Sequence, residues 1–146
     1  MPYLTQDRRN LLRQGQAPLT GGDLNYLVSL FYSDYLTEET LTYSAINQLL
    51  GSTRLLMLDL NEFFAGGCFP DAKSSNRVYT TLLQIVKRML NAAPEHVGLD
   101  AEVMGGLEGA IQELYRRVAS WYESSKLVKN GDVYNHILVN DEKARG

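Results

Sequence analysis

The chain has 146 residues, a length typical of one domain that buries its core without the help of disulfides or a structural metal. Its net charge is −3, with 14 basic and 17 acidic residues mixed along the sequence, which excludes a broad cationic surface for wrapping nucleic acid. The single cysteine, Cys68, excludes an internal disulfide, and no apolar run approaches the roughly 20 residues of a membrane span. The first residues also lack the apolar core of a signal peptide, so we expect a soluble, cytoplasmic protein.

The first two predicted helices are separated by a loop that contains glycine and proline. Thr5 can cap a short helix that runs to about Arg13, and because this helix has few apolar residues we expect residues 1–19 to form an N-terminal arm. Residues 20–23 then supply capping oxygens for a second helix, whose apolar side chains recur every three or four positions as far as about Thr37.

The third and fourth predicted helices follow. The third runs from about Thr42 to Phe64 and is the most hydrophobic, so we expect it at the centre of the core. Paired glycines and a proline end it, since glycine supplies a left-handed cap and proline cannot continue a helix. Ser74 or Ser75 is expected to cap the fourth helix, which ends near Asn91.

The longest helical pattern begins at Asp100, the expected N-cap, and continues for about thirty residues. Gly105, Gly106 and Gly109 weaken its first turns, which either close helix packing or the approach of a ligand phosphate to the backbone would explain. The Asn-Gly pair at 130–131 is compatible with the C-terminal cap of this helix and with a hairpin turn.

Together these patterns predict an all-α fold, a four-helix bundle-like pair of αα-hairpins with a short N-terminal helix and one long C-terminal helix. Residues 20–134 form one helical domain, with hairpins at 20–66 and 74–134, and residues 135–146 form a flexible tail. The two hairpins are faintly similar in sequence, which both a duplication and the general likeness of amphipathic helices explain.

The densest cluster of aromatic and charged residues lies on the last helix and directly after it. Guanidinium groups bind phosphate in bidentate fashion and aromatic rings stack on bases, so the cluster suits a nucleotide-like ligand. The same residue types dominate protein interfaces, and an ordinary amphipathic helix with ion pairs four residues apart is a further interpretation. The cluster includes Trp121 and Glu123, and its candidate ligand-binding residues are Tyr115, Arg116, Arg117, Tyr122, Lys126, Asn130, Asp132 and Tyr134.

Signals for catalysis are weak. His96 and His136 have no partner at the spacing of a zinc site, and no base is placed beside Cys68, so we expect no catalytic residue, metal or cofactor. Carboxylates on facing helices can hold magnesium, as in a helical nucleotide hydrolase, although a solvated helix face is the simpler explanation for them. The carboxylates concerned are Asp59, Glu62, Glu108 and Glu113.

The same C-terminal cluster carries a resemblance to a known family. The Glu-Leu-Tyr-Arg-Arg-Val motif at 113–118, with Trp-Tyr-Glu at 121–123, Lys126 and Asn-Gly-Asp-Val-Tyr at 130–134, resembles the C-terminal signature of a small uncharacterised family, a domain of unknown function, found in phages, prophages and bacteria. Met-Pro-Tyr-Leu at 1–4 and Asp-Leu-Asn-Tyr at 23–26 resemble two further marks of this family. Most family members are shorter; here residues 51–101 form an additional region and a tail follows Tyr134.

The resemblance implies a phage-type accessory protein that acts by binding, in the host cytoplasm if it is phage-encoded, and the family has no established activity to transfer. The first hypothesis is a non-enzymatic homo-oligomer that sequesters a nucleotide-derived small molecule in counter-defence. In it Arg116, Arg117 and Lys126 hold phosphate while three tyrosines, at 115, 122 and 134, stack or donate hydrogen bonds. The second is a protein-interaction module that binds a host or viral protein through the same helix. A metal-dependent helical hydrolase is the third, and neither a membrane nor nucleic acid is an expected partner.

Overall fold

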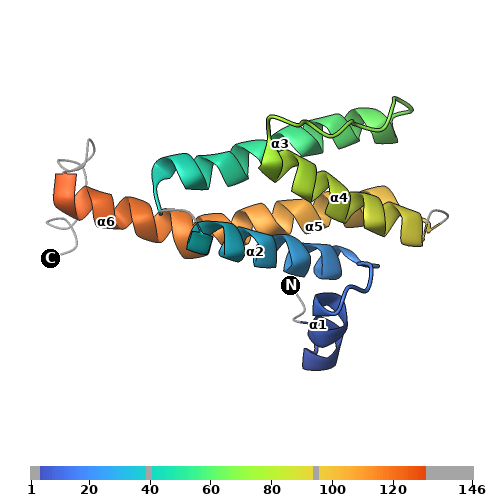
Figure 1. Ribbon diagram of the computed structural model, residues 1–146, viewed down its shortest axis with the longest axis horizontal. Helices are drawn as coiled ribbons and strands as arrows, with labels where there is room; N and C mark the ends of the chain where they lie inside the picture. Colours follow the sequence, from blue (N-terminus) through green and yellow to red (C-terminus); the bar gives the residue numbers. More distant parts are fainter. Residues whose placement is uncertain (1–3, 39–40, 94–95, 131–146) are drawn as a thin grey trace, which may run out of the picture. The chain divides into compact units, whose positions relative to one another are not determined.

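The computed structural model describes residues 4–38, 41–93 and 96–130, and it confirms the all-α class, with no strand in these three stretches (Figure 1). Residue contacts divide the chain into two compact units, unit 1 (Met1–Leu114) and unit 2 (Tyr115–Gly146). Unit 1 contains α1 (Gln6–Arg13), α2 (Gly21–Glu38), α3 (Tyr43–Phe64), α4 (Arg77–Ala92) and α5 (Leu99–Leu114), and unit 2 contains the π-helix η1 (Tyr115–Ala119) and α6 (Ser120–Asn130). The boundary between the units thus falls inside the segment that the sequence predicts as one long helix.

Two predicted helix starts are confirmed by their capping hydrogen bonds. The Thr5 hydroxyl accepts a hydrogen bond of 3.2 Å from the backbone N–H of Arg8 at the start of α1. The Thr42 hydroxyl accepts one of 3.1 Å from the backbone N–H of Ala45 at the start of α3. Each cap satisfies a backbone donor that the first turn of a helix leaves without a partner.

The predicted start of α4 is wrong by one or two residues. Neither Ser74 nor Ser75 is the N-cap; Asn76 is, and its side-chain oxygen accepts a 3.0 Å hydrogen bond from the backbone N–H of Tyr79. The same oxygen accepts a 3.2 Å hydrogen bond from the side chain of Gln48 on α3. The local sequence does not distinguish Asn76 from the two serines as the cap. The contact with Gln48 of α3 explains why Asn76 is the cap.

The predicted start of α5 is also displaced. The helix begins at Leu99, and Asp100 lies in its first turn instead of capping it. The first helical hydrogen bond runs from the backbone N–H of Glu102 to the carbonyl oxygen of Gly98, whose positive φ of 81° turns the chain into the helix. Asp100 still interacts favourably with the helix, because a carboxylate in the first turn faces the positive end of the helix dipole.

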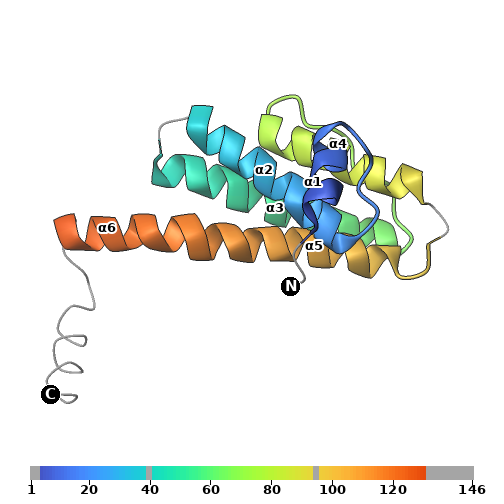
Figure 2. The ribbon, with the colours of Figure 1, turned by 90° about the horizontal axis from the view of Figure 1, so that it is seen from below.

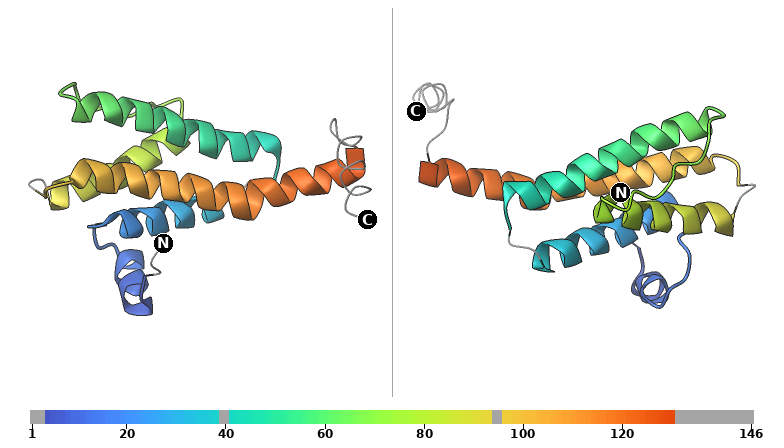
Figure 3. Two further views of the ribbon diagram at one scale, coloured as in Figure 1. Left: turned by 180° about the vertical axis from the view of Figure 1, so that it is seen from behind. Right: turned by 45° about the horizontal axis from the view of Figure 1, so that its top comes forward.

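The helices of unit 1 pair as α2 with α5 and α3 with α4 (Figures 1 and 2). The loop after α3 returns along that helix, so α3 and α4 run in similar directions, as Figure 3 shows. It is α2 that contacts each of α1, α3, α4 and α5. The expectation that the third helix lies at the centre of the core is therefore wrong: α2 occupies that position, and Leu58 of α3 is 64% exposed.

Apolar side chains on the facing sides of these helices form the core of unit 1, and burial of their surface is the main favourable term in folding. The largest fully buried apolar side chains are Leu24 and Val28 of α2, Leu49, Leu56 and Leu60 of α3, Val78, Leu82, Val86 and Met89 of α4, and Val103 and Leu107 of α5.

Close packing explains two of the three glycines of α5. A Cβ atom on Gly106 would lie 2.7 Å from the carbonyl oxygen of Gly21 and 3.0 Å from the Leu24 side chain, and one on Gly109 would lie 2.7 Å from the Asn25 amide nitrogen. At Gly106 the contact is with backbone, which cannot move aside, and at Gly109 the Asn25 side chain would have to shift, so the glycines allow α5 to approach α2 closely. A Cβ on Gly105 would meet nothing within 4 Å, so packing does not account for that residue.

Candidate functional site

The predicted ligand-binding residues begin in a stretch of π-helix. The Tyr-Arg-Arg motif occupies the first three positions of η1, and regular α-helix resumes at Ser120. A π-helix has a wider turn than an α-helix, so each residue after it takes a different direction from the one that an unbroken α-helix would give it, and such turns are frequent at functional sites. The sequence pattern, which predicts one continuous helix here, does not reveal this irregularity.

Large side chains are exposed along residues 115–127 of unit 2, which we call the aromatic segment. Trp121, the sole tryptophan of the chain, is 63% exposed, and Tyr115 and Leu127 are 45% and 43% exposed. Arg116 and Arg117 are exposed beside them. Arg117 lies in η1 and Trp121 in the first turn of α6.

Tyr122 and Lys126 are only partly exposed, and they contact each other. The Lys126 ammonium nitrogen lies 5.5 Å from the centroid of the Tyr122 ring, within the range of a cation–π interaction. The structure therefore brings this pair of predicted site residues together on one turn of α6 and places Tyr115, Arg116 and Arg117 in the preceding π-helix.

The remaining predicted site residues lie at the limit of the described chain. Asn130 is the last residue of α6, and its side chain, like Asp132 and Tyr134 altogether, lies outside the described residues. The helix continues through residues 127–130, so the alternative of a hairpin strand over these residues is wrong.

The carboxylates that a metal-dependent hydrolase would use are not gathered into a site. Asp59 of α3 accepts a hydrogen bond from the Tyr79 hydroxyl of α4, and burial together with this carboxylate raises the pKa of Tyr79. Glu108 of α5 accepts a 3.4 Å hydrogen bond from Gln112. Across the described ranges, no group of three or more His, Cys, Asp or Glu side chains is arranged to hold a metal ion.

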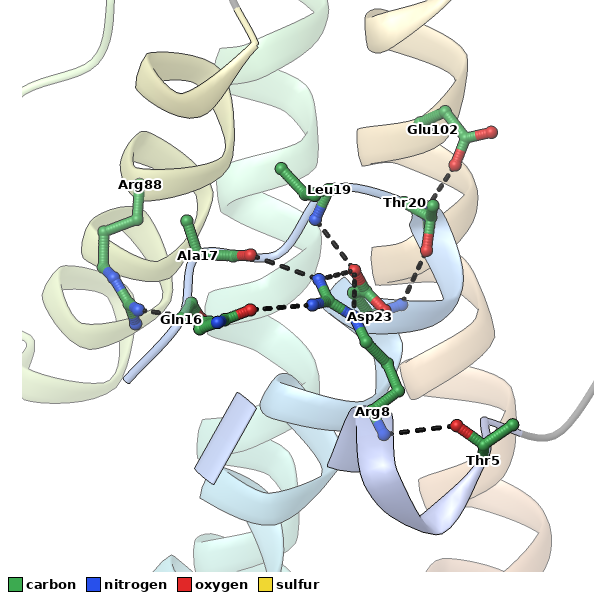
Figure 4. Close-up of polar contacts among 10 residues, drawn as sticks. Thr5, Arg8, Gln16, Ala17, Leu19, Thr20, Asp23, Arg88 and Glu102 are labelled. Carbon is green, nitrogen blue, oxygen red and sulfur yellow. Dashed lines mark hydrogen bonds and ion pairs between the residues drawn. The ribbon is translucent and has the colours of Figure 1, made fainter. Parts of the chain in front are cut away.

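An ion pair between a partly exposed arginine and a buried aspartate, which the sequence does not reveal, fixes α1 to α2 (Figure 4). The Arg8 guanidinium donates to the Asp23 carboxylate, with a closest nitrogen–oxygen distance of 2.5 Å, and the backbone N–H of Leu19 donates to the same carboxylate at 2.9 Å. Burial opposes the ionisation of Asp23, but the hydrogen bonds from Arg8 and from the backbone outweigh it and lower the pKa of this carboxyl. The loop before α2 is held from the other side, because Arg88 of α4 donates to the carbonyl oxygen of Gln16 at 3.1 Å.

The residues at 23–26, one of the marks of the family resemblance, thus have structural contacts in unit 1. Asp23 binds Arg8, Asn25 faces Gly109, and the Tyr26 ring lies 5.6 Å from the Arg9 guanidinium. These contacts hold α1 and α5 against α2, which accounts for the residues without any ligand.

Two hollows in unit 1 lie outside the predicted ligand-binding residues. One, of about 410 Å³, lies where α3 and α4 begin, and its charged residue, Arg77, pairs with Glu38 at 3.2 Å. Its lining residues are Tyr35, Thr42, Ser44, Ala45, Gln48, Arg77 and Val78. The other, of about 350 Å³, is lined by residues that include Phe63, Phe64 and His96.

Comparison with known proteins identifies no relative: no family model, curated protein or solved structure matches the chain. No helix within the described part of the chain is long and apolar enough to cross a membrane. Function must therefore be inferred from the chemistry of the exposed and buried groups.

Proposed function

We propose that the protein is a non-enzymatic binding protein and that the aromatic segment, residues 115–127, is its docking helix for a protein partner. The observation that carries this proposal is the 63% exposure of Trp121, in a segment that also exposes the side chains of Tyr115 and Leu127. Tryptophan, tyrosine and arginine contribute most of the energy in protein interfaces, because they bury a large area while retaining a polar group. Exposing several of them on one short helix is costly for solubility unless a partner covers them.

The shape of the segment favours a protein over a small molecule. Small-molecule sites are concave and enclose most of the ligand surface. The two hollows described above are lined by residues of unit 1, with none from the aromatic segment. A convex helix that presents apolar and aromatic side chains suits the groove of another protein, in the manner of helix-in-groove recognition.

Charge indicates the chemistry of that groove. Arg116 and Arg117 are adjacent and exposed at the start of the segment. Arginine forks match carboxylates in bidentate geometry, so we infer a partner whose apolar groove has acidic side chains at its rim. The resemblance of this segment to the phage and prophage family supports a host protein as that partner, with counter-defence as the setting.

The test uses two variants and a matched control. Trp121→Ala and Arg117→Ala should abolish capture of a host protein that the wild-type chain retains from a cell extract, while Val97→Ala, which truncates a side chain that is 95% exposed in unit 1, should leave capture unchanged. The captured protein is then purified and titrated against the wild-type chain, with Trp121 fluorescence as a direct probe of the segment. If this titration leaves the emission and acrylamide quenching of the sole tryptophan unchanged, or if both variants retain the partner, the docking helix is elsewhere.

A second candidate function is the sequestration of a nucleotide-derived small molecule, which the cation–π pair of Lys126 and Tyr122 favours. Native mass spectrometry of freshly purified protein separates the two proposals. An adduct of a few hundred daltons that is lost with Arg117→Ala supports the small molecule. A clean mass together with Trp121-dependent protein capture supports the docking helix.

A further inference from the structure

One face of α3 is exposed although the helix is part of the core of unit 1. Leu58 and Leu55 are 64% and 38% exposed on this face, and a Cβ atom on Gly51 would meet nothing within 4 Å. The spacing of three and four residues places the exposed positions on a single stripe. We define the α3 outer stripe as Gly51, Arg54, Leu55, Leu58, Asn61, Glu62 and Ala65, all of which are exposed.

The α3 outer stripe is complementary to itself. Leu58 is its most exposed apolar residue, and the other members are arranged symmetrically about it: Arg54 and Glu62 four positions away on either side, Gly51 and Ala65 seven positions away. When two copies of a helix pack antiparallel about a twofold axis, a residue before the centre faces the residue equally far behind the centre in the partner. With Leu58 at the axis, opposite charges therefore face each other twice, and the small residues meet at both ends.

The charges on the stripe are available for this pairing. Arg54 and Glu62 take no part in the ion pairs Arg8–Asp23 and Arg77–Glu38. Asp59, the remaining carboxylate on this part of α3, is hydrogen-bonded to Tyr79, so its carboxylate is directed toward α4.

We propose that the α3 outer stripe is the interface of an antiparallel homodimer, with Leu58 on the twofold axis and Arg54 of each copy paired with Glu62 of the partner subunit. The small residues at 51 and 65 let the helices approach closely at both ends, and the two leucines supply the apolar contact. A single pair of helices over 15 residues, about 21 Å, is a small interface, so we expect a dissociation constant in the micromolar range. This inference is independent of the proposed function.

Charge reversal gives the first test, with sedimentation velocity across the micromolar range as the readout. The wild-type chain should dimerise, and Arg54→Glu and Glu62→Arg should each raise the dissociation constant at least about tenfold, because two like-charged contacts replace two attractive ones. The double variant exchanges the charges and should restore the dissociation constant to within about threefold of wild type. Lys87→Glu, the same change of charge at an exposed position of α4, is the control and should have no effect.

Crosslinking gives the second test and locates the axis. In a Cys68→Ser background, Leu58→Cys should form a covalent dimer on mild oxidation much faster than Gln84→Cys, an exposed position on α4. A monomeric wild-type chain, a double charge variant that stays as weak as the single variants, or equal crosslinking at positions 58 and 84 would each overturn the proposal. Circular dichroism of every variant verifies that the helices are intact.

Discussion

Large side chains are buried where α2 and α5 cross, and they are exposed in the aromatic segment, although both regions are helical. At the crossing, glycines bring two backbones together and apolar side chains such as Leu24 and Leu107 are fully buried. In the aromatic segment, Trp121 and Tyr115 project into solvent. Apolar periodicity of three and four residues is present in both regions. An apolar pattern therefore predicts a helix and identifies its apolar side. It does not predict whether that side packs against the same chain or against another molecule.

Gly106→Ala should break the crossing and have the largest effect on stability. The added Cβ would lie 2.7 Å from the Gly21 carbonyl oxygen, where no flexible group can move aside, so we expect a loss of about 2–3 kcal/mol in the free energy of unfolding. Gly105→Ala is the matched control: its Cβ meets open space, and it should stabilise the helix by about 0.5–1 kcal/mol. Urea unfolding followed by circular dichroism measures both, and equal effects of the two substitutions would show that α2 and α5 are not in close contact.

Asp23→Asn should have the next largest effect, since it removes the charge that holds α1 against α2. The Asp23 side chain is 3% exposed and receives hydrogen bonds from Arg8 and Leu19, so we expect a loss of about 2 kcal/mol at neutral pH. The substitution leaves the partly buried Arg8 guanidinium with a neutral amide oxygen, which is a weaker acceptor than a carboxylate. Urea unfolding at pH 7 measures the difference from wild type.

The same pair predicts a pH dependence with a definite sign. The pKa of Asp23 is lower in the folded than in the unfolded chain, so its contribution is present above the unfolded value of about 4 and is lost as pH falls through the folded value. The stability difference between wild type and Asp23→Asn should therefore shrink below about pH 4. A difference that stays constant on acidification would contradict the lowered pKa.

Tyr32→Phe should have a smaller effect on the same core. The Tyr32 hydroxyl lies 2.5 Å from the Thr53 hydroxyl, which itself donates to the Leu49 carbonyl oxygen at 2.7 Å, so Tyr32 is the donor in the first of these bonds. Burial raises the pKa of Tyr32 to about 12, and the neutral hydroxyl keeps this bond throughout the physiological range. Its loss should cost about 1 kcal/mol in urea unfolding, because Thr53 retains its other partner. A loss of unfolding free energy as large as that of Gly106→Ala would show that the tyrosine hydroxyl stabilises the core by more than this one hydrogen bond.

The features that the sequence predicted are those decided by neighbouring residues. The cap at Thr5, the start of α3 near Thr42 and the all-α class follow from local hydrogen bonds and periodicity. The start of α4 was mispredicted because a contact of Asn76 with Gln48, distant in sequence, selects the cap. The sequence marks Gly106 as unusual in a helix, but the reason for the glycine is the backbone of Gly21, which lies opposite it in the structure.

The candidate site divides in the same way. The types and spacing of residues predicted the cluster of aromatic residues and arginines, but the π-helix at Tyr115–Ala119 and the exposure of Trp121 depend on three-dimensional structure. The pairing of Arg8 with Asp23 joins two helices across a loop, so periodicity could not reveal it. The proposed roles of Asp132 and Tyr134 stay predictions, since both lie outside the described residues.

Trp121→Ala should have the smallest effect on stability, because the Trp121 side chain is exposed whereas the side chains at the α2–α5 crossing are buried. Removing a side chain that is 63% exposed should change the free energy of unfolding by no more than about 0.5 kcal/mol, whereas truncation of a buried aromatic residue costs about 3–5 kcal/mol. Urea unfolding measures this directly, and Leu24→Ala in the crossing provides the buried reference, with an expected loss of about 2–5 kcal/mol. A large loss for Trp121→Ala would mean that the indole supports the fold of its own chain and would remove it as the anchor for a partner. A small loss combined with loss of partner capture would assign the tryptophan to recognition, because a side chain that contributes nothing to folding has its apolar surface available for another molecule.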